Sequence, residues 1–349
     1  MTNPVVGIIG GGQLGSMLAS AAKKINIKSV IFCDDEDAPA KKFSDEFIFG
    51  NYDDKIKIKE FIEKVDIVTF EFENIPYNTL KEINNFKKVL PRPEINKIVQ
   101  NRLNEKDFLN KININTTMYT SIKNEKDLKS NSDLLPGMLK TCSLGYDGKG
   151  QYKIETDKEL DNLKPDFSKD YILEKFINLK KEISVIITRF DKDKYEIYEP
   201  IENVHEDQIL RYSKIPSDIN KSIFEKSKEW AIKISEELNY VGTLCVEYFI
   251  DKNDNLYVNE IAPRVHNSGH LTINSHNISQ FENHIRAVCN LDQIKIKKNF
   301  NAKMKNLIGE DINFYRKKKL NENEFFFDYL KKEVKKKRKM GHLTTIEKC

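Results

Sequence analysis

The chain has 349 residues, 39% of them hydrophobic, and its 58 basic and 54 acidic side chains give a formal net charge of +4. This length predicts two or three lobes, and a charge so small for the size argues only weakly for a nucleic-acid partner. No apolar run approaches the ~20 residues of a membrane span, no secretory signal opens the chain, and the five cysteines include no C-x-x-C pair, so we expect a cytoplasmic protein.

The N-terminal segment carries a glycine-rich motif between a strand and a helix. Val5 to Ile9 is apolar and runs into GGGQLG at residues 10–15, which opens a helical pattern, and a second strand, Ser29 to Phe32, ends at Asp34. Strand, G-x-G-x-x-G, helix, strand and acid together form the dinucleotide-binding fingerprint, which favours a nicotinamide enzyme. The same glycines would also serve any ligand phosphate at a helix N-terminus, or a tight turn without a ligand.

A second candidate contact region follows the next predicted strand. Asp54 to Lys64 has a helical pattern, and Asp66 to Phe72 (DIVTFEF) indicates a strand that ends near Glu73 and Asn74. Ligands of open α/β sheets bind beyond the carboxyl ends of strands, so these two side chains are well placed for contact, although exposed acids at strand ends are common. Helices are then expected at 78–86, 94–103 and 104–112, with a domain boundary near residue 113.

A second glycine-rich loop follows a predicted strand at Gly137 to Cys142. Residues 145–151 read GYDGKGQ, with three glycines in six residues, and Lys140 lies on the preceding strand. Such a loop can wrap its amides around phosphate and can open and close, and the lysine can reach the same anion. An Asp-Gly pair is also a good hairpin turn, but the lysine and the additional Gly150 favour a phosphate lid.

The middle of the chain alternates strands with amphipathic helices. Strands are expected at 171–176, 182–190 and 195–200, and helices at 218–238 and 278–290. Glu202, Asn203 and His205 are expected in a loop after the third of these strands.

Two acidic side chains interrupt apolar strands on either side of a polar turn. CVEYFI contains Glu247, YVNEIA contains Glu260, and DKNDN joins them. If the loop is the four residues Lys252 to Asn255, Glu247 faces Glu260 on one side of the sheet, and a slip of one residue would separate them. Carboxylates held this way repel each other unless a cation lies between them, and a hard divalent ion with phosphate oxygens fits best. Solvated carboxylates are the alternative, but the neighbouring Asn259 and an Arg/His cluster favour Mg²⁺.

The last part of the chain is lysine-rich and less clearly organised. A weak strand is expected at 304–308 and a last strand into Cys349. The run 331–342, KKEVKKKRKMGH, is followed by a strand pattern, so we expect it to fold back onto the body rather than to form a free tail.

With these residues laid out, the chain resembles the ATP-grasp superfamily, and within it the N5-carboxyaminoimidazole ribonucleotide synthases. The resemblance covers nearly the whole chain, and its most specific segments are GYDGKGQ, NEIAPRVHNSGH and SQFE, supported by GIIGGGQLGSML, TFEFENIP and RKMGH. It implies an α/β ATP-grasp fold with a doubly wound, Rossmann-like N-terminal domain (1–112), an ATP-grasp domain (113–290) and a small C-terminal lobe (291–349).

The resemblance implies a ligase of purine biosynthesis that forms a C–N bond and works as a cytoplasmic homodimer. Such an enzyme joins ATP, bicarbonate and aminoimidazole ribonucleotide and yields ADP, phosphate and the carboxylated nucleotide. Bicarbonate is first phosphorylated to carboxyphosphate, which then delivers CO₂ to the exocyclic amine. Mg²⁺ or Mn²⁺ is the implied metal, and neither nucleic acid nor a membrane is an implied partner.

The resemblance also implies roles for individual residues. Asp147, Lys149 and Lys332 would act at the carboxylation centre, and Glu247 and Glu260 would hold the metal. ATP would be bound by Arg102, Lys140, Gly145, Tyr146, Asp147, Gly148, Lys149, Gly150, Gln151, Glu174, Lys175, Phe176, Ile177, Glu182, His205, Asn259 and Glu260. The aminoimidazole nucleotide would be surrounded by Gln13, Leu14, Glu73, Arg264, His266, Lys332 and Arg338, with Glu73 at its amine.

Two departures from the family pattern are expected to matter. Lys149 stands where the lid usually has an arginine, which keeps the charge but loses the planar fork. Relatives usually continue beyond RKMGH, so a shortened C-terminal lobe is expected.

Three rival functions remain open. One is another ATP-grasp ligase of a purine precursor, such as formate-using glycinamide ribonucleotide transformylase. The second is a nicotinamide-dependent oxidoreductase that uses Gly10, Gly12, Gly15 and Asp34. The third is a non-catalytic nucleic-acid binder that uses Lys331 to Lys339, and it would bind DNA or RNA with a steep salt dependence.

Overall fold

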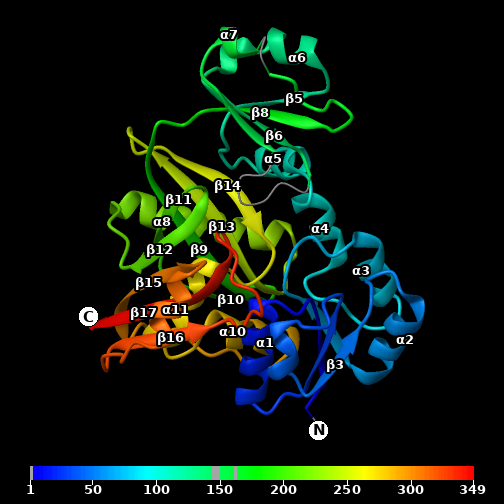
Figure 1. Ribbon diagram of the computed structural model, residues 1–349. Helices are drawn as coiled ribbons and strands as arrows, with labels where there is room; N and C mark the ends of the chain where they lie inside the picture. Colours follow the sequence, from blue (N-terminus) through cyan, green and yellow to red (C-terminus); the bar gives the residue numbers. More distant parts are fainter. Residues whose placement is uncertain (1–2, 144–149, 161–162) are drawn as a thin grey trace.

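Four parallel strands form a sheet at the N-terminal end of the chain, in the order β3-β2-β1-β4 (Figure 1). The computed structural model describes residues 3–143, 150–160 and 163–349. The strands of this sheet are β1 (Val6–Ile9), β2 (Ser29–Cys33), β3 (Glu46–Phe49) and β4 (Ile67–Phe70). The helices of this part and its connection are α1 (Gln13–Lys24), α2 (Lys55–Lys64), α3 (Tyr77–Asn84), α4 (Pro93–Val99) and α5 (Arg102–Lys111).

The strands predicted at the start of the chain are confirmed, and one more was missed. All residues of β1 and β2 are buried, as expected of parallel strands that are covered on both faces. Helix α2 begins after Asp54, whose side chain accepts hydrogen bonds from the amides of Ile56 and Lys57. Strand β3 lies at the sheet edge with only Ile48 buried, and its apolar run is just the three residues Phe47 to Phe49.

Two antiparallel sheets follow. The smaller has the order β5-β8-β6-β7 and lies at the top of Figure 1, and the larger runs β14-β13-β9-β11-β12-β15-β17-β16, with β10 beside β9. The smaller sheet and its helices are β5 (Tyr119–Ile122), α6 (Glu125–Ser130), β6 (Gly137–Thr141), β7 (Gln151–Ile154), α7 (Asp157–Leu160) and β8 (Tyr171–Lys175). The larger sheet and its helices are β9 (Leu179–Asp191), β10 (Lys194–Ile197), β11 (Ile201–Glu206), β12 (Ile209–Ile215), α8 (Lys221–Glu237), β13 (Gly242–Asp251), β14 (Leu256–Ala262), α9 (Thr272–Ser275), α10 (Gln280–Val288), β15 (Phe300–Ile308), α11 (Asp311–Tyr315), β16 (Glu324–Asp328) and β17 (Lys339–Lys348).

The C-terminal strands complete the large sheet. Strand β15 pairs with β12, and β17 pairs with both β15 and β16. The basic run folds back as expected, since Lys332 Nζ lies 2.7 Å from Asp37 Oδ2 in the N-terminal part. Glu202, Asn203 and His205 were expected in a loop, but they lie in strand β11, because the polar sequence IENVHE hid a half-buried strand.

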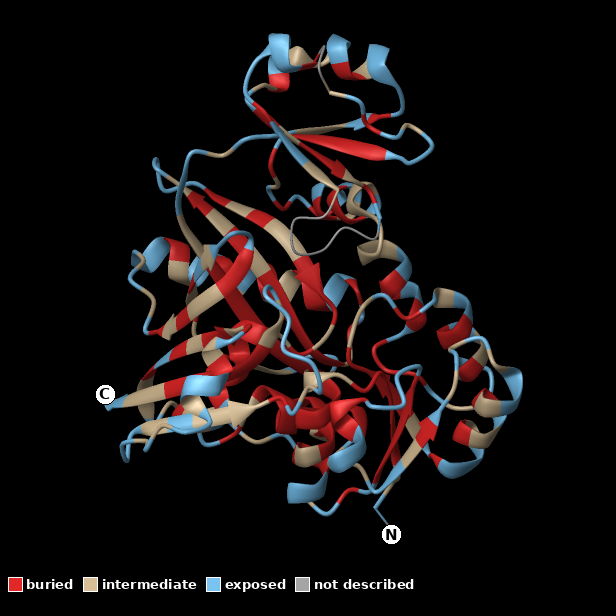
Figure 2. Cartoon of the chain, in the orientation of Figure 1, coloured by how far each residue is buried: buried red, intermediate tan, exposed pale blue. Residues whose placement is uncertain are grey.

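Burial follows the sheets. Figure 2 shows buried residues concentrated in the strands of the N-terminal and large sheets, while the small helices α6 and α7 are largely exposed. In the part of the chain that the structure describes, no helix has the length and apolar character of a membrane span.

The β13–β14 hairpin reaches the predicted pairing by an unexpected route. Near the turn Tyr248 faces Val258, a register in which Glu247 would face Asn259. A β-bulge then shifts the register by one residue, so that Glu247 faces Glu260. The predicted pairing is confirmed, but the bulge produces it rather than the length of the turn.

Helix α10 is joined to both neighbouring sheets through His284. Its Nε2 lies 2.8 Å from Thr69 Oγ1 on β4, and its Nδ1 accepts the amide hydrogen of Thr243 on β13 at 3.0 Å. The ring is fully buried, and burial lowers its pKa to about 3. One neutral imidazole therefore ties the N-terminal sheet to the large sheet.

Acidification should destabilise the fold through this histidine. The pKa of His284 falls from 6.5 to about 3 on folding, so its contribution is complete above pH 6.5 and is lost as the pH falls towards 3. At pH 5 the loss is about 2 kcal/mol of unfolding free energy. We compare the free energy of unfolding in urea at pH 7 and at pH 5. Between these two pH values it should fall by about 2 kcal/mol less in His284→Gln than in the wild type. An equal loss in the two proteins would contradict a neutral His284.

Candidate active site

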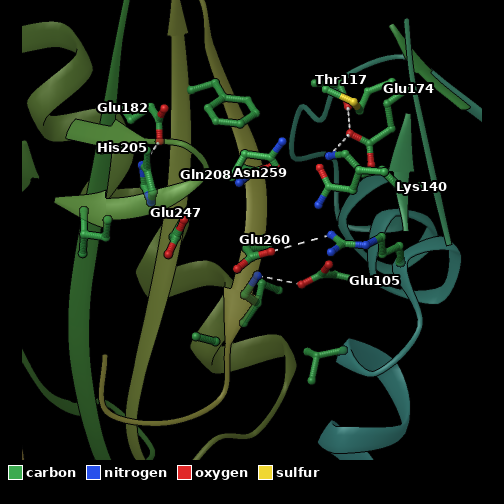
Figure 3. Close-up of a pocket in the computed structure, with 18 of the residues that line it drawn as sticks. Glu105, Thr117, Lys140, Glu174, Glu182, His205, Gln208, Glu247, Asn259 and Glu260 are labelled. Atoms are coloured by element: carbon green, nitrogen blue, oxygen red, sulfur yellow. Dashed lines mark hydrogen bonds and ion pairs between the residues drawn. The ribbon is translucent and has the colours of Figure 1, made fainter. Parts of the chain in front are cut away.

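A cavity of about 500 Å³ opens between the small sheet, the large sheet and α5 (Figure 3). Figure 3 shows Glu182, His205 and Glu247 on one wall and Lys140 and Glu174 on the opposite wall. Fifteen of the predicted site residues line it: Glu73, Arg102, Lys140, Gln151, Glu174, Lys175, Phe176, Ile177, Glu182, His205, Glu247, Asn259, Glu260, Arg264 and His266.

Lys140 forms the cationic part of one wall. Its Nζ lies 3.1 Å from Glu174 Oε2, and the fully buried Lys106 approaches the same oxygen at 3.7 Å. Burial alone would raise the pKa of Glu174, but these two lysines lower it to about 2. Burial lowers the pKa of Lys106, and the charge of Glu174 opposes this shift. Two lysines around one carboxylate give this wall donors that suit a phosphate. Sequence reasoning missed Lys106, because nothing in a charged helical segment indicates which lysine is buried.

Glu247 and Glu260 form the acidic part of the cavity. Glu247 Oε1 lies 2.8 Å from His266 Nε2, and Glu260 Oε2 lies 3.7 Å from Arg102 Nη1. Burial and the neighbouring Glu247 raise the pKa of Glu260. Burial alone would also raise the pKa of Glu247, but His266 lowers it to about 2.

These two acids fit a magnesium ion that is shared with a nucleotide. They are half-buried in the cavity and repel each other, so a cation between them removes an unfavourable interaction. Within the described ranges no three His, Cys, Asp or Glu side chains gather as a complete metal site. Mg²⁺ that also binds nucleotide phosphates needs only one or two carboxylates, so the pair is sufficient.

Glu105 on α5 supports the strand that carries Glu260. Its Oε1 accepts the amide hydrogen of Ile261 at 2.6 Å, next to Glu260. Burial, followed by the charge of Glu260, raises the pKa of Glu105. Sequence reasoning missed this residue as well, since its partner lies far along the chain.

The wall formed by β9 and β11 carries Glu182 and His205. Glu182 Oε2 lies 2.6 Å from His205 Nδ1. Burial alone would lower the pKa of His205, but the carboxylate of Glu182 raises it. Across the cavity mouth Phe176 exposes 42% of its surface, which gives a flat ring of a ligand an apolar contact.

The end of the cavity next to the N-terminal sheet contains an ion pair. Arg264 contacts Glu73 through both Nε and Nη2, with Nη2 3.1 Å from Oε1. Burial alone would raise the pKa of Glu73, but Arg264 lowers it. Arg264 thereby holds the Glu73 carboxylate, which accepts hydrogen bonds, beyond the carboxyl end of β4. Contact with a ligand was predicted there from the sequence.

The other residues predicted for the nucleotide acceptor, Gln13, Leu14, Lys332 and Arg338, are not among the described residues of the cavity wall. Leu14 is buried in the N-terminal core, and Gln13 precedes it at the first turn of α1. Lys332 is exposed and Arg338 is half-buried on the C-terminal segment, which contacts the N-terminal part through the ion pair of Lys332 with Asp37.

Most of the predicted lid lies outside the described residues, namely Gly145, Tyr146, Asp147, Gly148 and Lys149. The described end of the loop returns beside Lys140, because Gln151 pairs with it between β7 and β6. Gly150 adopts φ +71°, a conformation that favours glycine, and its carbonyl accepts the amide hydrogen of Thr141 at 3.0 Å.

Sequence models of three families match successive parts of the chain. Residues 3–100 match the ribonucleotide synthetase preATP-grasp domain, and residues 107–281 match the ATP-grasp domain. Residues 302–348 match the phosphoribosylaminoimidazole carboxylase C-terminal domain.

Similar proteins and structures carry one description. The chain is 37% identical to an N5-carboxyaminoimidazole ribonucleotide synthase of Bacillus subtilis, over 98% of this chain and 91% of that protein. It is 38% identical to the synthase of Staphylococcus aureus, over 98% and 92%. An ADP complex of such a synthetase superimposes with a TM-score of 0.94 at 35% identity, covering 99% of this chain and 94% of the other. The Aspergillus clavatus enzyme in complex with ADP and aminoimidazole ribonucleotide gives 0.90 at 28% identity, over 99% and 94%.

Proposed function

The chain belongs to the N5-carboxyaminoimidazole ribonucleotide synthase family, and from that premise we propose how its own residues carry out the reaction. It is an ATP-grasp ligase that carboxylates aminoimidazole ribonucleotide in purine biosynthesis at the expense of ATP. The transformylase, nicotinamide and nucleic-acid alternatives are therefore set aside. One observation carries the assignment of roles: a single cavity brings together Lys140, the Glu247/Glu260 pair and the Glu73/Arg264 pair.

ATP occupies the part of the cavity between the two antiparallel sheets. Its adenine lies against the exposed ring of Phe176, next to Lys175 and Ile177, and its ribose lies towards Glu182 and His205. Arg102, Lys140 and the lid residues up to Gln151 bind the phosphates. The wall around Lys140 supports this placement. Lys106 also contacts the carboxylate of Glu174, so Glu174 neutralises less of the charge of Lys140.

Mg²⁺ is held by Glu247 and Glu260, with Asn259 beside them. The bulge supports this assignment, because it lets the consecutive residues 259 and 260 both line the cavity, whereas consecutive residues of a regular strand point to opposite faces. Bound there, the ion would neutralise charge on the nucleotide phosphates. His266 holds Glu247 in place from the other side.

Bicarbonate and the acceptor nucleotide meet at the end next to the N-terminal sheet. Glu73, kept charged and oriented by Arg264, accepts a hydrogen bond from the amine of the acceptor. Asp147, Lys149 and Lys332 complete the carboxylation centre, and Gln13, Leu14, His266 and Arg338 surround the nucleotide. Lys149 contributes charge to this centre without the two-point contact of an arginine.

We further propose a cytoplasmic homodimer with domains 1–112, 113–290 and 291–349. The use of ATP supports the location, and the three family matches follow the same order of domains along the chain.

The assignment is tested by omitting each component in turn from a coupled ADP assay with isotopically labelled bicarbonate. We expect fast ADP release only with ATP, bicarbonate and aminoimidazole ribonucleotide together, and label in the nucleotide product. Formate should not replace bicarbonate: one oxygen of either acid leaves with the phosphate, so bicarbonate still delivers the two oxygens of a carboxylate whereas formate would deliver a formyl group with one. Turnover with glycinamide ribonucleotide and formate would contradict this proposal.

A further inference from the structure

The G-x-G-x-x-G loop at residues 10–15 already holds an anion, and that anion is the side chain of Glu71. Oε1 of Glu71 accepts the amide hydrogen of Gly12, and Oε2 accepts that of Gly15 at 2.5 Å. Glu71 directly follows β4, which pairs with β1, so the carboxylate reaches the loop from the neighbouring strand. The free backbone amides at the N-terminus of α1 would attract a phosphate. In this protein the side chain of Glu71 accepts their hydrogen bonds instead.

All three glycines of the fingerprint make room for this carboxylate. A Cβ at Gly10 would lie 2.5 Å from Glu71 Cγ, and one at Gly12 would lie 2.8 Å from Oε1. A Cβ at Gly15 would lie 3.2 Å from Oε2 and 2.6 Å from the carbonyl of Gly10. The spacing that signals a dinucleotide site is therefore used here to admit Glu71.

The loop is also fixed against the acceptor side of the cavity. Leu14 lies in one buried cluster with Val265, which separates Arg264 from His266, and with Tyr329, which precedes the basic segment. Burial raises the pKa of Glu71, and the amides of Gly15 and Gly12 oppose this rise. The positive charges of Lys331 and Arg264, which come from the same side as the cavity, oppose it further. A shift of the loop would therefore displace Gln13 relative to Arg264.

We propose that Glu71 is a positioning residue for the nucleotide acceptor, which holds residues 10–15 so that Gln13 and the backbone of Leu14 meet the substrate. This inference rests on the proposed placement of the acceptor. Glu71 itself is buried behind the loop and does not touch the substrate. Its effect should therefore fall on the binding of the aminoimidazole nucleotide and leave ATP binding unchanged, since ATP lies against the antiparallel sheets.

Two variants that disturb the contact in different ways test this role. In Glu71→Gln one carboxylate oxygen becomes an NH₂ group, which cannot accept from a backbone amide. Gly12→Ala keeps the charge but places a methyl group against Oε1; Gly12 has φ −74°, so alanine fits the backbone there. We expect each variant to raise the KM for aminoimidazole ribonucleotide by about tenfold or more. The KM for ATP should change by less than about twofold, and Glu63→Gln on the exposed face of α2 should leave both KM values at wild-type levels.

The double variant sharpens the result. If both changes act through one contact, combining them should raise the KM no further than the larger single effect. Unchanged KM for the nucleotide in folded Glu71→Gln, or equal rises in both KM values, would overturn the inference. If Glu71→Gln does not fold, Gly12→Ala decides on the same criteria. Wild-type enzyme that fails to use the nucleotide would instead overturn the proposed function, before any variant is compared.

Discussion

Replacing Glu260 by glutamine should lower the rate of ADP formation by about a hundredfold or more at saturating ATP. The change removes one of two negative ligands from the proposed magnesium site and leaves the shape of the side chain intact. Glu247→Gln should act in the same direction. Titrating Mg²⁺ against ADP formation should show that both variants need more metal for half-maximal rate.

Stability separates this effect from damage to the fold. Burial and Glu247 raise the pKa of Glu260, so removing its charge relieves repulsion in the metal-free protein. The free energy of unfolding of metal-free Glu260→Gln should therefore equal or exceed that of the wild type. Glu225→Gln on the exposed face of α8 is the matched control and should have wild-type turnover. Wild-type turnover in both Glu247→Gln and Glu260→Gln would refute the metal site.

Replacing Lys140 by methionine should lower kcat/KM for ATP by about a hundredfold or more, because the phosphates lose a cation that is buried and held in place by Glu174. Methionine keeps most of the length of the side chain, so packing beside Glu174 changes little. Initial rates over a range of ATP concentrations give the effect, and the KM for the aminoimidazole nucleotide should change much less.

Lys106→Met is the informative comparison. Both lysines pair with Glu174, but Lys140 lines the cavity whereas Lys106 exposes only 2% of its surface and is absent from the described cavity wall. Removing Lys106 should lower the free energy of unfolding by less than the ~3 kcal/mol that a fully broken buried pair costs, because Glu174 keeps its contact with Lys140. The effect on ATP use should be smaller than that of Lys140→Met. Identical kinetic losses in the two variants would show that Lys140 acts only through Glu174.

The hairpin shows how far local reasoning reaches. The polar turn and the two acids among apolar residues predicted that Glu247 faces Glu260, and they do. The turn, however, sets a register that would have paired Glu247 with Asn259, and the bulge restores the pairing. A bulge depends on how a strand packs against its neighbours, which no pattern of apolar residues encodes.

The sequence by itself determined the features that depend on residues close together in the chain. These are the buried strands β1 and β2, the glycine loop that follows β1, and the helix start at Asp54. Its motifs also indicated the family and, with it, half of the described residues that line the cavity. Such features follow from periodicity, capping and backbone freedom, which act over a few residues.

Only the tertiary structure decided which distant groups meet. Nothing local indicates that Glu71 fills the loop of residues 10–15, that Lys106 shares Glu174 with Lys140, or that Glu105 reaches the amide of Ile261. Each contact joins side chains from different strands or helices. The physical reason is that the order of strands in the sheets sets these distances, and the resulting low-dielectric surroundings then set the charges that the site can hold.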